Sequence, residues 1–78
     1  MDIDRIKEIL LDNFPYVSWR VEEWEYAFVI TAGIFDLKKA TSIPKILIED
    51  AVDPELPIFH IARQTRNEII RFHAKTEL

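Results

Sequence analysis

The spacing of apolar residues changes twice along this 78-residue chain, and this change constrains the fold more than any other feature. Near both ends the apolar residues recur every three or four positions, whereas between Tyr16 and Thr31 they alternate with polar ones. The first spacing is typical of amphipathic helices and the second of half-buried strands. Because a chain of this length forms one domain, we expect residues 1–78 to fold as a single globular α+β domain.

The first helix is predicted over Ile3–Asn13. Its apolar side chains fall on one side at about 100° per residue: Ile3, Ile6, Leu10 and Phe14. Asp2 is a suitable N-cap, because its carboxylate can accept a hydrogen bond from an unpaired backbone N–H of the first turn. Pro15 marks the end, since the residue before a proline avoids helical backbone angles.

Strands are predicted within Tyr16–Thr31, where aromatic and β-branched residues alternate with polar ones. Glu22 and Glu23 lie between the two arms and are interpreted as the turn of a hairpin, with one long bent strand as the alternative. Gly33, the only glycine, is expected to end the second strand. A loop or short helical turn is expected to follow at residues 35–39.

The short run Lys45–Glu49 is interpreted as a third strand, because it is β-branched and bounded by Pro44 and Asp50. A helix is the alternative, since so short a run has no decisive period. The expected order is α-β-β-β-α, with an antiparallel three-stranded sheet and two helices. The alternative order, α-β-β-α-β-α, requires a helix over Lys45–Val52 and a strand over Ile58–Ala62.

The last helix, predicted over Pro57–Lys75, has the most regular apolar stripe of the sequence: Ile58, Ile61, Ala62, Thr65, Ile69 and Phe72. Phe59 and Ile70 lie about 100° and 120° away from Ile58 around this helix and form a second apolar strip. One stripe is enough to cover a sheet. The second strip therefore predicts an interface, either of a homodimer or of a complex with another protein, built partly on this helix.

The two tryptophans are further interface candidates. Trp19 and Trp24 lie on opposite arms of the expected hairpin, next to three glutamates. Exposed tryptophan among charged residues is common in binding hot spots. Burial in the core is the alternative, because both residues are in phase with apolar neighbours.

The composition argues against several kinds of site. Without cysteine the chain forms no disulfide or thiolate metal site, and one glycine cannot build a phosphate-binding loop. His60 and His73 point about 140° apart around the last helix, so they cannot chelate one metal ion by themselves. No catalytic, cofactor-binding or metal-binding residue is predicted, and no cofactor is expected.

The charge and the apolar runs bear on partners and location. The net charge is -4, so we expect nucleic-acid binding to be weak or absent. The alternative uses the basic face of the last helix, with His60, Arg63 and Arg71. Neither a basic leader segment after Met1 nor an apolar run of about 20 residues is visible, so we expect no membrane span and a cytoplasmic location.

These observations favour a small, acidic, non-enzymatic protein-binding module of the inhibitor, immunity or adaptor type. Its partner is expected to be a protein, either a second copy of the chain or another molecule. Two alternatives remain from other classes: a nucleic-acid-associated regulator that acts through the last helix, and a small enzyme with a site shared across a dimer.

Overall fold

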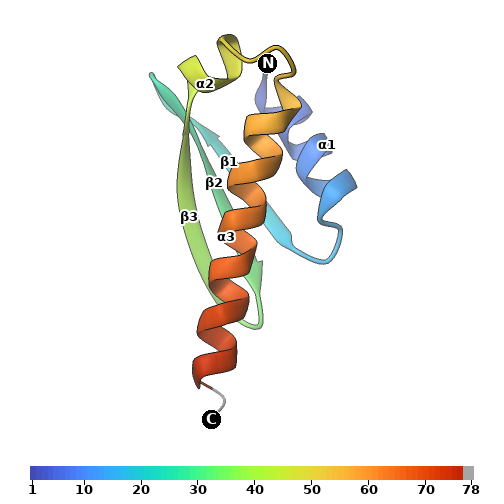
Figure 1. Ribbon diagram of the computed structural model, residues 1–78, viewed down its shortest axis with the longest axis vertical. Helices are drawn as coiled ribbons and strands as arrows, with labels where there is room; N and C mark the ends of the chain where they lie inside the picture. Colours follow the sequence, from blue (N-terminus) through green and yellow to red (C-terminus); the bar gives the residue numbers. More distant parts are fainter. Residues whose placement is uncertain (77–78) are drawn as a thin grey trace.

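The computed structural model describes residues 1–76, with α1 (Ile3–Asn13), β1 (Ser18–Glu23), β2 (Ala27–Ile34), β3 (Leu37–Pro44), α2 (Lys45–Glu49) and α3 (Glu55–Thr76). The strands form one antiparallel sheet in the order β1-β2-β3. α1 packs on β1 and α3 packs on β3 and β2, so the two helices lie together on one face of the sheet (Figure 1). The predicted α+β class and antiparallel three-stranded sheet are confirmed, and an extra short helix gives the order α-β-β-β-α-α.

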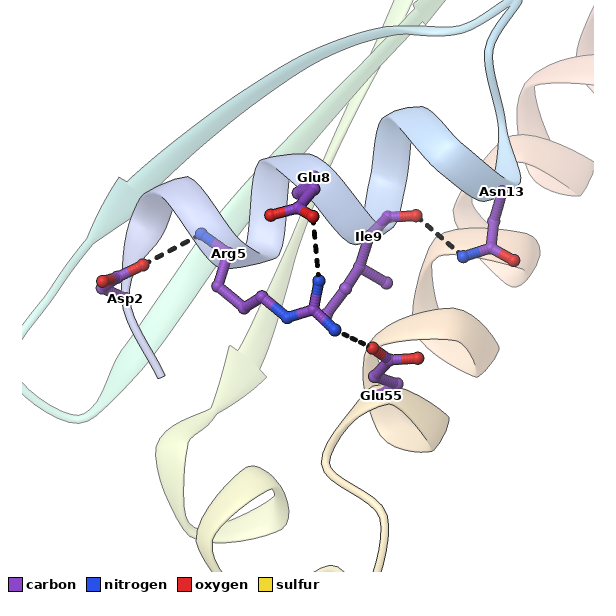
Figure 2. A network of polar contacts seen from close by, with 6 residues as sticks. All are labelled: Asp2, Arg5, Glu8, Ile9, Asn13 and Glu55. Carbon is purple, nitrogen blue, oxygen red and sulfur yellow. Dashed lines mark hydrogen bonds and ion pairs between the residues drawn. The ribbon is translucent and has the colours of Figure 1, made fainter.

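α1 has the predicted bounds because both of its ends are fixed by local hydrogen bonds (Figure 2). The backbone N–H of Arg5 donates to the Asp2 carboxylate at 2.9 Å, which is the expected N-cap. At the other end the Asn13 side chain donates to the backbone carbonyl four residues earlier, at 2.8 Å. The Arg5 guanidinium forms ion pairs with Glu8 and with Glu55, and the second pair joins α1 to the start of α3.

The first hairpin turn lies at residues 25–26, so the predicted turn at Glu22 and Glu23 is wrong. Both glutamates belong to β1, where they pair with residues of β2. The turn is closed by the backbone N–H of Trp24, which donates to the carbonyl of Ala27 at 2.8 Å. The alternation continues through the glutamates, and this places the turn later than the charged pair suggested.

The predicted loop over residues 35–39 is also wrong, because the chain reverses over Phe35 and Asp36 alone and β3 begins at Leu37. The two turn residues have positive φ angles of 55° and 60°, as in the type I′ turns that join hairpin strands. Neither is glycine or asparagine, so the usual sequence signal of this turn is missing. Gly33 does not end β2, which continues to Ile34.

Lys45–Glu49 forms helix α2 and not the predicted third strand. The backbone N–H of Lys45 still donates to the carbonyl of Tyr26 at 2.9 Å, and the chain leaves the sheet directly afterwards. Only Ile48 of this helix is buried. The alternative order is wrong as well, because Ile58–Ala62 lies within α3.

The core lies between the inner face of the sheet and the helices, and its fully buried side chains include Ile6, Leu10, Ile30, Ile43, Ile58 and Ala62. Within residues 1–76, Thr65 is the one polar residue in the buried set. Its hydroxyl hydrogen-bonds to the Thr41 hydroxyl at 2.9 Å and donates to the carbonyl of Ile61 at 2.8 Å. A polar group therefore enters the core only with its partners in place.

α3 is longer than the sheet beneath it. Its 22 residues span about 33 Å, whereas the eight residues of β3 span about 27 Å. Figure 1 shows its C-terminal turns extending past the β2–β3 turn. Phe72 belongs to the predicted core stripe but is 56% exposed, in a groove that it lines together with Leu37 of β3. No helix in the described part of the chain is long and apolar enough to cross a bilayer.

Candidate interaction surfaces

The four side chains predicted for an interface are not brought together. Trp19 is half-buried, and its indole N–H donates to the carbonyl of Phe14 at 3.2 Å. Phe59 stacks on the Phe14 ring, with centroids 5.4 Å apart. Trp24 at the first hairpin turn is 61% exposed, and Ile70 in the C-terminal half of α3 is 42% exposed. Two of the four side chains are thus engaged within the chain, and the other two lie on separate surfaces.

The basic residues of the nucleic-acid alternative are exposed on α3. His60, Arg63 and Arg71 all reach solvent, and the Arg63 guanidinium lies 5.7 Å from the centroid of the Phe59 ring. Arg63 and Arg71 are about 12 Å apart along the helix axis. These side chains follow the helix in a thin row and do not gather into a patch.

Exposed apolar side chains are found instead on the first hairpin turn and on α2. Both segments lie at the end of the molecule opposite the C-terminus (Figure 1). We call this surface the α2 end and define it by five exposed residues: Trp24, Tyr26, Ile46, Leu47 and Val52. The pairing of Ala27 with Pro44 and the hydrogen bond from Lys45 to Tyr26 join the hairpin to α2. Of these five residues, only Trp24 was named from the sequence as an interface candidate. The exposure of Ile46 could not be predicted, because it depends on α2 being a helix and not a strand.

The α2 end is surrounded by acidic residues: Glu22, Glu23, Glu25, Glu49, Asp50 and Asp53. The Lys45 ammonium pairs with Glu23 at 2.9 Å and lies 5.3 Å from the centroid of the Phe28 ring. The Trp24 indole N–H donates to Glu22 at 3.4 Å. Because one of the few nearby cations is already paired, the potential around this apolar surface is negative.

A groove lies between β3 and the C-terminal half of α3, far from the α2 end. We call it the β3–α3 groove; its volume is about 350 Å³ and it is lined by Leu37, Lys38, Lys39, Glu68, Ile69 and Phe72. The Lys39 ammonium and the Glu68 carboxylate form an ion pair at 3.6 Å across it. Apolar side chains from both elements thus face solvent at the outer side of β3.

The titratable side chains form no obvious reaction centre. Across residues 1–76, no three His, Asp or Glu side chains are placed to hold a metal ion together. His60 and His73 are about 20 Å apart along α3, and the His73 ring stacks on Phe35 with centroids 4.0 Å apart.

The chain was compared with protein-family models, with curated proteins and with solved structures. None of the three comparisons gives a match.

Proposed function

We propose that this protein is a non-enzymatic interaction module of the inhibitor or adaptor type, and that its α2 end binds an apolar segment rich in Lys and Arg on another protein. The observation that carries this proposal is the gathering of five large exposed apolar side chains at one acidic end of a small domain. Exposed apolar patches of this kind usually mark binding sites. Aromatic anchors such as Trp24 and Tyr26 are typical of hot spots.

The backbone that carries the aromatic anchors is held in place before any partner arrives. The Trp24 N–H donates to the carbonyl of Ala27, and the Tyr26 carbonyl accepts from the N–H of Lys45. A pre-organised surface loses little conformational entropy on binding. Burial of each large apolar side chain contributes about 1.5–3 kcal/mol, while the surrounding carboxylates accelerate the encounter with a basic partner.

The test compares immobilised wild-type protein with Trp24→Ser and with Tyr16→Ser in lysate of the native host, with quantification by mass spectrometry. Tyr16 is the control, because it is an aromatic residue that is even more exposed than Trp24 and lies on the connection between α1 and β1. The captured protein is then purified and its affinity measured directly. Removal of a hot-spot side chain that contributes about 2 kcal/mol weakens binding about 30-fold. We therefore expect an approximately 30-fold lower affinity for Trp24→Ser and wild-type affinity for Tyr16→Ser.

The salt dependence of the same binding provides a second test. If carboxylates of the α2 end meet basic groups, affinity falls as NaCl rises from 50 to 500 mM. A purified partner that binds Trp24→Ser and Ile46→Ser as tightly as wild type would show that the α2 end is not the site. Micromolar binding of DNA or RNA at physiological salt, lost on changing Arg63 and Arg71 to Ala, would instead support the nucleic-acid alternative.

A further inference from the structure

β3 has a free edge whose backbone groups can be assigned. In an antiparallel ladder, residues alternate between those whose backbone bonds to the neighbour and those whose backbone points away. Lys45 bonds back to Tyr26 of the hairpin, so the odd-numbered residues of β3 face β2. The backbone N–H and C=O of Lys38, Ala40 and Ser42 therefore point outward, and within residues 1–76 no strand pairs with them.

The β3–α3 groove opens beside this edge. Lys39 points to the helix side of the sheet, yet its side chain is 50% exposed. Ile61, Glu68 and Phe72 fall within about 40° of one another around α3, on the side of the helix that faces Lys39. The free edge is consequently flanked by a row of α3 side chains, of which Ile61 is half-buried and Phe72 is exposed.

The edge of β1 does not offer the same space. β1 is an edge strand as well, but Val21 on its inner face is only 7% exposed because α1 covers it. Of the two sheet edges, β3 is the one where an exposed lysine on the helix side and the β3–α3 groove adjoin the strand.

We propose that a second copy of this chain binds antiparallel along β3, with the two-fold axis at Ala40, and that the two sheets join into one of six strands. In this register Ala40 lies opposite Ala40 of the partner subunit, and Lys38 lies opposite Ser42 of the partner subunit. Lys39 likewise meets Thr41 of the partner subunit. The outward backbone groups then form about six hydrogen bonds between the copies.

Charge excludes two of the neighbouring registers. A two-fold axis at Lys38 or at Lys39 would place two lysines directly opposite each other, which destabilises strand pairing. Lysine on an edge strand generally discourages unspecific pairing. With the axis at Ala40, no lysine lies directly opposite another lysine.

The same two-fold axis covers the exposed part of the β3–α3 groove. Thr41 is level with Thr65, and Lys39 is level with Glu68, so α3 runs antiparallel to β3. Rotation about Ala40 brings Phe72 level with Ile61 of the partner subunit. The proposed dimer requires the two α3 helices to pack at the usual interaxial distance of about 8–10 Å. The expected homodimer therefore uses α3 through the Ile61–Phe72 side and not through Phe59 and Ile70.

The test is the oligomeric state of charge variants at the two-fold axis, measured by sedimentation velocity at micromolar concentration. Ala40 is exposed, so Ala40→Lys and Ala40→Glu are expected to fold normally. Each variant alone places like charges opposite each other and is expected to be monomeric. An equimolar mixture places Lys opposite Glu and is expected to restore a dimer, since only a contact between the two copies at this position lets one variant rescue the other.

Ser18→Lys is the matched control, because Ser18 is exposed on the other edge strand; this variant is expected to remain dimeric. A strictly monomeric wild-type protein at 100 μM concentration, or Ala40 variants that dimerise as well as wild type, would overturn the proposal. Partner binding at the α2 end is a separate property. Monomeric Ala40→Lys is expected to retain it, so the two proposals fail independently.

Discussion

The two halves of α3 have similar apolar spacing but different surroundings. In the N-terminal half, Ile58, Ala62 and Thr65 are almost completely buried between the sheet and α1. In the C-terminal half, Phe72 continues the stripe but lines the β3–α3 groove, and it is more than half exposed. An amphipathic stripe thus determines which side of a helix can be buried, whereas the opposing layer determines which residues of that side are covered.

The largest effect on stability is expected for Ile58→Ala in the buried half. Ile58 is fully buried, and removal of a large aliphatic side chain from a core costs about 2–5 kcal/mol in the free energy of unfolding. We expect the upper part of this range, because the site is enclosed by helix and sheet. Urea unfolding at one fixed protein concentration measures the loss, with Ile70→Ala in the exposed half as the control, for which less than about 1 kcal/mol is expected. Equal losses for both variants would remove the distinction between the two halves.

Ile69→Ala tests where the buried half ends. Ile69 is buried, but it also lines the β3–α3 groove, so the surroundings can relax into the space left by the side chain. We expect a loss in the lower part of the range of about 2–5 kcal/mol, measured by the same unfolding experiment. A loss below about 0.5 kcal/mol would mean that the core ends before Ile69.

The sequence predicted the two long helices of this fold better than the short helix α2 or the third strand. α1 was predicted with its observed bounds, because an N-cap and a proline act within a few residues of the helix they delimit. β3 was missed because it is an edge strand with lysines at positions 38 and 39, and because the turn before it contains Phe35 and Asp36. Its strand state depends on pairing with β2, which no local pattern reveals.

The candidate surfaces were predictable only in part for the same reason. Trp24 could be flagged from its glutamate neighbours, but its environment depends on how hairpin and α2 meet. Ile46 and Leu47 were interpreted as strand residues, so their exposure on a short helix was not foreseen. The free edge of β3 becomes visible only when the sheet order is known.

Thr65→Val tests whether a hydrogen-bonded hydroxyl contributes more to stability in the buried half of α3 than in the exposed half. The change removes the hydroxyl that bonds to Thr41 and to the backbone of α3, and Thr41 is left without this partner at the edge of the core. We expect a loss of about 1 kcal/mol. Thr76→Val is the control in the exposed half, because the Thr76 hydroxyl also bonds to backbone carbonyls of its own helix but in solvent. No measurable loss is expected there, and a similar cost for both variants would show that burial of Thr65 contributes nothing.

The smallest effect, and a gain, is expected for Asp36→Gly in the turn beneath the C-terminal half of α3. Asp36 has a φ of 60°, and the left-handed region costs a residue with a side chain about 1–2 kcal/mol. Glycine avoids this cost but loses about 0.5–1 kcal/mol through the greater freedom of the unfolded chain, so a net gain of about 0.5 kcal/mol is expected.

Phe35 in the same turn stacks on His73, so this turn contributes to the contact between the last turns of α3 and the sheet. Hydrogen exchange of the backbone amides near His73 should therefore slow in Asp36→Gly, while exchange near Ile58 should change only by the global gain. If exchange slows equally in both halves, the end of α3 is not held by the turn, and the difference between the two halves lies in side-chain burial alone.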